Sequence, residues 1–227
     1  MQLDPIFRGP TSVLVWGDDR SLLNWVAYAL ASVTDPEFHW TDVRYPDQAV
    51  SATDPLARGR IPPNRLSVVE TRELAPNDAS ANVAVSAVIR SDEIPDNVQR
   101  VLDFLRLPTI TQRVLEQTPP EGRPRVVVLS NGHRITAFYP TPDVIDPTLR
   151  AIVGANTILI MTFGDAGPGG RFRFDNVLHL EGSVRDGWRS ASLMVEKWVP
   201  GGPFEKGTTH QLADLSSIAD VLARELG

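Results

Sequence analysis

Short unbroken runs of hydrophobic residues alternate along this chain with segments of helical periodicity. The first run covers residues 12–16, is rich in β-branched residues and ends at Gly17, which is typical of a strand buried on both faces. From Arg20 onward the apolar spacing changes to that of a helix, at Leu22, Val26 and Leu30. The pattern therefore predicts a strand, a tight turn and a helix at the start of the chain.

Similar runs predict the remaining elements. Strands are expected at residues 38–44, 66–71, 125–130, 157–163, 176–181, 190–198 and 208–212. Helical spacing marks residues 96–117, broken at Pro108, and residues 146–155 and 215–226. Residues 45–65 read as an irregular connection, and residues 74–95 suit either a strand or a helix. The run at 125–130 is the most strand-like, so we expect it to be the central strand.

Strands that alternate with helices favour one class of fold. They predict an α/β protein in three layers, with a mainly parallel central sheet covered on both faces and an antiparallel addition near the C-terminus. The chain has 227 residues, a length that suits one α/β domain. We therefore expect residues 1–227 to form a single domain.

Composition excludes several classes of function. The chain has no cysteine, which rules out disulfides, thiolate catalysis and cysteine metal sites. Its net charge of −6 argues against a generally basic surface for nucleic acid, although a local patch would be compatible with it. There is no apolar run near the ~20 residues that span a bilayer and no secretory pattern at the N-terminus. We expect a cytoplasmic protein without a membrane partner.

The turn after the first strand is where a nucleotide-binding α/β protein would hold phosphate. A phosphate loop needs Gly, four residues and Gly-Lys-Ser/Thr, whereas this chain has Gly17, Asp18, Asp19, Arg20 and Ser21. The second glycine and the lysine are missing, and two carboxylates oppose a triphosphate by like-charge repulsion. Arg20 and Ser21 could be a remnant of the Lys-Ser/Thr pair, but ordinary helix capping by the aspartates is the favoured interpretation.

The order of these pieces resembles a known family. The resemblance rests on the strand–turn–helix at residues 13–31, the loop at 121–125 leading into the strand at 126–130, the buried strand at 157–163, and a C-terminal series. That series is NVLHLEGS at 176–183, Trp188, LMVEK at 193–197 and GGP at 201–203. Together they resemble the RecA-type ATPase fold, in its KaiC/Rad55-like branch. Such a resemblance implies a RecA-like domain that commonly forms rings or filaments.

Departures from the family pattern shape the functional hypothesis. The family's Mg²⁺-associated aspartate ends a strand before a serine, where this chain has Leu129 and Ser130. Glu70 falls near the place of the family's water-activating glutamate and is a weak candidate for a catalytic base. Without amide cradle, lysine and metal carboxylate, the main electrostatic terms of phosphoryl transfer are missing. We therefore expect a pseudo-ATPase that serves as a regulatory or assembly module, with ATP and Mg²⁺ disfavoured as cofactors.

Two other hypotheses stay open. One is an NTPase with an unconventional phosphate site made by Arg20, Ser21 and Glu70. The other is a nucleic-acid binder that uses the glycine-rich loop at residues 164–170 together with Arg171 and Arg173.

The resemblance also suggests a subunit contact at Lys197, so a protein partner or self-association is expected. The histidines, His39, His133, His179 and His210, have no metal-ligand spacing, and no metal site is expected. His133 follows a turn and is a minor candidate for a cleft residue.

Overall fold

A computed structural model of the chain describes residues 6–7, 9–44, 59–70, 122–130, 150–164, 173–185, 188–199 and 204–212. Eight strands and one long helix lie in these ranges. The strands are β1 (Thr11–Gly17), β2 (His39–Arg44), β3 (Leu66–Glu70), β4 (Arg125–Leu129), β5 (Thr157–Gly164), β6 (Asn176–Arg185), β7 (Trp188–Lys197) and β8 (Thr209–Leu212). The helices are α1 (Arg20–Thr34) and the short 3₁₀ turn η1 (Pro63–Arg65). Among the described helices, none is long and apolar enough to cross a membrane.

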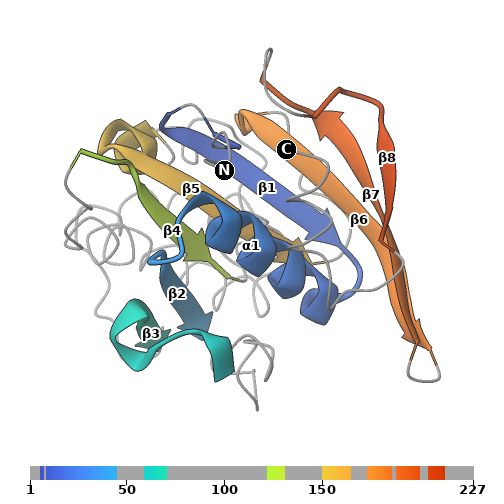
Figure 1. Cartoon of the computed structure of the whole chain (residues 1–227), viewed down its shortest axis with the longest axis horizontal. Coiled ribbons are helices and arrows are strands. Elements are labelled where there is room, and N and C mark those ends of the chain that lie inside the picture. The colour runs from blue at the N-terminus through green and yellow to red at the C-terminus, as the bar shows by residue number, and fades with distance from the viewer. Residues whose placement is uncertain are drawn as a thin grey trace, which may run out of the picture.

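All eight strands belong to one sheet, in the order β3-β2-β4-β5-β1-β6-β7-β8 (Figure 1). The pairs from β3 to β6 are all parallel, while β6–β7 and β7–β8 are antiparallel. The expected mainly parallel sheet with a C-terminal antiparallel addition is therefore confirmed. One detail was wrong: β4 is third from an edge, and β5 and β1 occupy the centre.

The centre of the sheet is buried on both sides, as its sequence predicts. In β4 and β5 every residue is buried, so successive side chains on opposite faces are all shielded from water. On one face α1 packs across β1, β4 and β5, and its Leu22, Val26 and Leu30 are at most 1% exposed. Burial of both faces means that layers lie above and below the sheet, in keeping with the expected three-layer arrangement.

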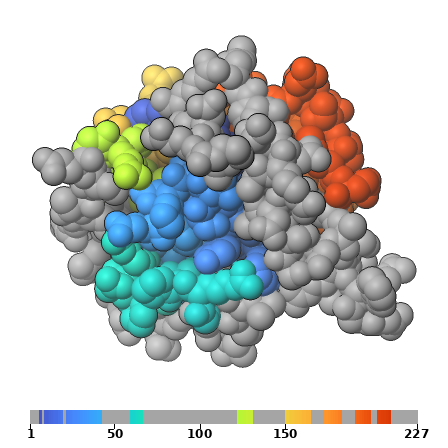
Figure 2. Space-filling model, in the orientation of Figure 1, coloured from blue at the N-terminus to red at the C-terminus, as the bar shows by residue number. Residues whose placement is uncertain are grey.

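A short segment before β3 closes the outer side of α1. Ile61 joins the same core cluster as the helix, and the Arg60 guanidinium lies 5.0 Å from the ring centroid of Trp25. Figure 2 shows residues 59–66 beside the helix. Edge-to-face contacts from Trp25 to Tyr28 and from Tyr28 to Phe38 continue this apolar layer toward β2. The helix is thus held between the sheet and this segment.

The predicted boundaries of the described elements agree with the structure to within a few residues. The strand expected at residues 176–181 extends to Arg185, and the one expected at 190–198 begins at Trp188. Of the helix expected at 146–155, the structure describes residues 150–154 as helical. The elements expected at residues 74–95, 96–117 and 215–226 and the GGP segment at 201–203 lie outside the described residues. The single-domain boundary stays a prediction.

Candidate functional site

The connection between β1 and α1 is only two residues long. Gly17 ends the strand and Arg20 begins the helix, so only Asp18 and Asp19 lie between them. The backbone N–H of Leu22 donates to Asp19 Oδ1 at 3.2 Å, and the N–H of Leu23 donates to the Asp19 carbonyl at 3.0 Å. Asp19 is therefore the N-cap of α1, and its carboxylate occupies one of the amides that a helix N-terminus could offer to an anion.

Gly17 is held against the neighbouring strand. A Cβ built on Gly17 would overlap the carbonyl oxygen of Leu180 and lie 3.2 Å from its carbonyl carbon. Leu180 is the register partner of Gly17 in β6, and Gly164 is its partner in β5. Close packing of β1 against β6 therefore requires glycine at this position, and a phosphate-binding role is not needed to explain it.

The end of β4 carries a polar pair that links it to β2. Leu129 is only 1% exposed, and the next residue, Ser130, is fully buried. The Ser130 hydroxyl donates to Asp42 Oδ1 at 2.9 Å, and its backbone N–H donates to the Thr41 carbonyl at 3.3 Å. A fully buried carboxylate thus lies beside the end of β4, but it comes from β2. In the sequence, Asp42 carries no signal beyond being one acid in an otherwise alternating strand.

An aromatic stack lies next to the turn on β1 and β6. The rings of Trp16 and His179 are parallel to within 4°, with centroids 3.6 Å apart. Trp16 Nε1 donates to Glu196 Oε2 on β7 at 3.2 Å, and His179 Nδ1 lies 3.8 Å from Glu181 Oε1. The His179 side chain is only 15% exposed. This stack ties three strands together, and the sequence showed only that His179 lies in a strand.

A polar network joins the amino ends of β1 and β6. The Asp175 carboxylate accepts hydrogen bonds from the backbone N–H of Ser12 at 2.8 Å and from its hydroxyl at 2.9 Å. Asn176 Nδ2 donates to the Thr11 hydroxyl at 3.0 Å. Lys197 Nζ donates to the Phe174 carbonyl at 2.6 Å. These bonds fix the start of β6 against β1, at the opposite end of the strands from the Gly17 turn.

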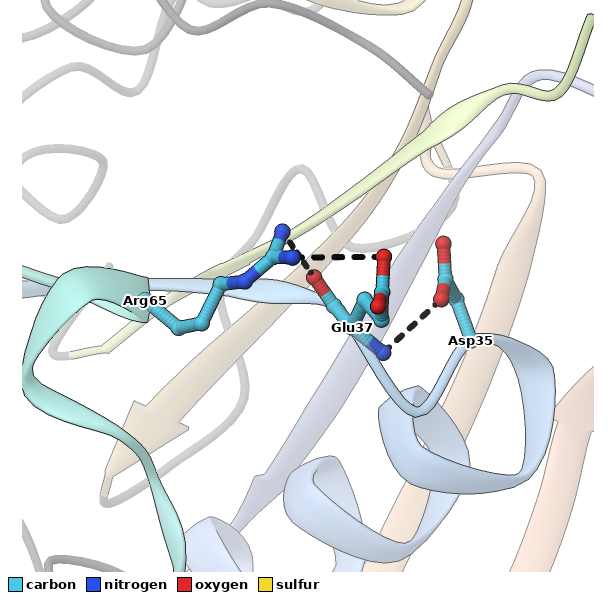
Figure 3. A network of polar contacts seen from close by, with 3 residues as sticks. All are labelled: Asp35, Glu37 and Arg65. Carbon is cyan, nitrogen blue, oxygen red and sulfur yellow. Dashed lines mark hydrogen bonds and ion pairs between the residues drawn. The ribbon is translucent and has the colours of Figure 1, made fainter. Parts of the chain in front are cut away.

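A second polar network lies where α1 passes into β2 (Figure 3). The Glu37 N–H donates to Asp35 Oδ1 at 2.8 Å, while Arg65 Nη1 donates to the Glu37 carbonyl at 2.9 Å and its Nη2 lies 3.2 Å from Glu37 Oε2. Arg65 thereby joins the start of β2 to the start of β3. Nearby, burial lowers the pKa of His39 from its ordinary value of 6.5, and the positive charge of Arg65 lowers the same pKa further.

Comparisons with known proteins bear on the fold alone. No protein-family model matches the sequence, and a search of curated proteins found no match. Among solved structures, the chain is similar to the flagellar accessory protein FlaH from Methanocaldococcus jannaschii, with a TM-score of 0.50. The sequence identity is 13%, and the match covers 92% of this chain and 91% of that chain. The fold is RecA-like. At this identity, the likeness says nothing about activity.

Within the RecA-like sheet, Glu70 lies far from the turn. It is the last residue of β3, opposite Arg44, and three strands separate β3 from β1. Four strand spacings of about 4.8 Å place the two strands roughly 19 Å apart. The structure therefore does not bring Glu70 together with Gly17, and its role as a base stays a prediction.

The basic candidates lie at the other end of the RecA-like sheet. Lys197 pairs with Val177, beside the start of β1, and Arg173 is exposed just before β6. Arg171 and His133 lie outside the described residues. A subunit contact through Lys197 stays a prediction; the hydrogen bond to Phe174 already gives its ammonium a structural partner.

Candidate metal ligands do not cluster in the part of the chain that the structure describes. Within those residues, no group of three or more His, Cys, Asp or Glu side chains converges in a way that could hold an ion.

Proposed function

We propose that this RecA-like domain lacks phosphoryl-transfer chemistry and works as a regulatory or assembly module. Proteins with this fold bind nucleotide at the turn after the first strand. In this chain the residues of that turn instead cap α1 and pack β1 against β6. We expect it to need no cofactor, with ATP and Mg²⁺ disfavoured. What the domain regulates or assembles with is inferred from fold resemblance alone.

The cap that Asp19 makes on α1 carries the proposal. A phosphate loop wraps several backbone amides around the anion and adds a lysine. Here two residues span the whole connection, and the Leu22 amide donates to the carboxylate of Asp19. Asp18 is exposed in the same turn, so a triphosphate would meet negative charge in place of amide donors.

Two further contacts support it. Gly17 is the one glycine that this turn shares with a phosphate loop, and its close approach to Leu180 explains why the position needs glycine. At the end of β4, where the family resemblance places a metal-binding carboxylate, the chain has the buried Leu129. The nearest buried carboxylate, Asp42, already accepts a hydrogen bond from Ser130.

The two alternatives have less support. An NTPase that uses Arg20, Ser21 and Glu70 would need the glutamate near the turn, and roughly 19 Å of sheet separates their strands. A nucleic-acid site at Arg171 and Arg173 would stand apart from the turn, because Arg173 lies at the amino end of β6.

Calorimetric titration with ATP and Mg²⁺ tests the proposal. We expect no binding heat at about 100 μM protein, because a turn without amide cradle or lysine gives the triphosphate no favourable electrostatic term. Asp19→Ser is the informative variant, since serine keeps a capping oxygen and removes one negative charge. If repulsion were the whole obstacle, this variant would bind ATP; we expect it to stay without binding.

Micromolar binding by the natural chain, accompanied by release of phosphate, would overturn the proposal. In that case Arg20→Ala decides the first alternative, because an unconventional site at Arg20 should lose hydrolysis in this variant. Oligonucleotide binding that weakens steeply with salt would instead favour the second alternative.

A further inference from the structure

Strand β8 is the outermost strand of the sheet at its antiparallel end (Figure 1). It pairs with β7 on one side, and no described strand lies beyond it on the other. The outer edge of such a strand carries backbone N–H and C=O groups that can pair with another chain. Which residues of β8 present these groups follows from the hydrogen bonds at the start of the β7–β8 ladder.

A glycine bulge fixes the register of this ladder. The Val195 N–H donates to the Thr208 carbonyl at 2.9 Å, and Gly207, whose φ is 86°, donates its N–H to the Val195 carbonyl at 2.7 Å. Val195 and Thr208 are therefore a hydrogen-bonded pair. Bonded and non-bonded pairs alternate along an antiparallel ladder, so Leu193 and His210 form the next bonded pair.

Two residues of β8 consequently turn their backbone away from β7. Thr209 and Gln211 are the register partners of Met194 and Ser192 in the non-bonded pairs, so their N–H and C=O groups point outward. Both side chains are exposed. The outer edge of β8 therefore offers two backbone donors and two backbone acceptors.

We propose that β8 is a self-association surface, on which two copies of this chain pair antiparallel about a two-fold axis between their His210 residues. This axis places Thr209 of one copy opposite Gln211 of the other, and the same pair forms again on its far side. Each pair exchanges two backbone hydrogen bonds, so four bonds join the two sheets into one. The inference rests on the assembly role in the proposed function and gives that role a specific surface.

Charge allows a second copy to be the occupant. Two chains with a net charge of −6 repel each other, but Thr209–Leu212 contains no Asp, Glu, Lys or Arg. The side chains that face each other across the axis, threonine and glutamine, are uncharged and can hydrogen-bond. The strand also lacks the lysine or proline with which natural edges prevent pairing. Because it has only four residues, the contact is small and we expect a weak dimer.

Amide hydrogen exchange of the full chain, followed by NMR at about 20 μM and about 500 μM, tests the surface, since dimerisation follows mass action. We expect the Thr209 and Gln211 amides to exchange at least twofold more slowly in the concentrated sample. The His210 amide faces β7 and should be equally protected in both samples.

A proline variant removes one outward donor from each copy. Gln211→Pro leaves the bonds to β7 in place, because the Gln211 N–H points away from that strand. Sedimentation velocity at about 500 μM should show a dimer at least tenfold weaker, since two of the four bonds are lost. Gln211→Ala is the matched control, because it removes the side chain and keeps the N–H, and it should change the dimer less than about twofold.

A pair of charged variants tests the register without proline. Thr209→Lys combined with Gln211→Lys places like charges opposite each other across the axis and should weaken the dimer. Thr209→Lys combined with Gln211→Glu places opposite charges there and should strengthen it. The first combination adds two positive charges to a chain of net charge −6, so general repulsion alone would give the opposite order.

Several results would overturn the inference: a monomer at about 500 μM, equal effects of Gln211→Pro and Gln211→Ala, or the reverse order of the charged variants. Slow exchange of the Thr209 and Gln211 amides already in the dilute monomer would show that another segment of the chain covers the edge. A dimer that leaves these amides unprotected would refute β8 as the surface and keep an assembly role. ATP titration of the same samples separates the two proposals, because nucleotide binding would refute the proposed function whether or not β8 pairs.

Discussion

Replacing Gly17 with alanine should destabilise the protein by about 1–2 kcal/mol. The added Cβ would overlap the Leu180 carbonyl oxygen, which belongs to the backbone of a strand paired on both sides. Relief therefore requires a shift of β1 or β6, and overpacking of this kind costs about 1–3 kcal/mol. Alanine returns about 0.4–1 kcal/mol by restricting the unfolded chain, and subtracting the middle of this range from the middle of the first leaves about 1.3 kcal/mol, within the loss stated above.

Urea denaturation measures this loss directly. For a chain of 227 residues we take a slope of about 3 kcal/mol/M, so the midpoint should fall by about 0.3–0.7 M. Gly154→Ala is the matched control, because a Cβ there meets nothing within 4 Å and the residue ends a helical segment. The control should be neutral or slightly stabilising. A Gly17→Ala protein as stable as the natural chain would refute the packing explanation of this glycine.

Three further predictions concern polar groups. Asp19→Ala removes the cap of α1 and should cost about 1 kcal/mol, or about 2–4 °C in Tm by calorimetry, whereas Asp19→Ser should keep most of the stability; equal losses would contradict the cap. His39 has a lowered pKa, so the unfolded chain takes up its proton first, and stability should fall as pH drops below 6.5. His39→Gln should flatten that fall in urea titrations between about pH 7.5 and 5.5. Arg65→Met should make the fall smaller and end it at a higher pH, since the folded His39 then protonates more readily; unchanged curves would count against both contributions. Ser130→Ala leaves the buried Asp42 short of a donor and should cost about 1–3 kcal/mol by denaturation, and no loss would mean that the hydrogen bond contributes nothing net.

Local elements were predictable because their signals are local. Runs such as residues 125–129 and 157–163 combine β-branched residues with burial on both faces, and both form strands. The order of strands was not predictable in the same way. The hydrophobicity of β4 shows that it is buried, but β1 and β5 are buried as well, and only their long-range pairing places them at the centre.

In the candidate site too, contacts between residues close in sequence were predictable and long-range contacts were not. The cap by Asp19 involves Leu22, three residues away, and the sequence indicated it. The need for glycine at position 17 depends on Leu180, and the partner of Ser130 is Asp42, 88 residues earlier. Contacts of this kind depend on strand register, which no local pattern encodes.

The position of β1 between β5 and β6 has a consequence for synthesis. The strand is synthesised well before its partners, because Ser12 bonds to Asp175, 163 residues later. Until β5 and β6 have left the ribosome, the backbone N–H and C=O groups on both edges of β1 lack their native hydrogen-bond partners. The centre of the sheet can therefore be completed only after β2, β3 and β4 have been made, and loss of the C-terminal third would leave an early, apolar strand open to pairing with other chains.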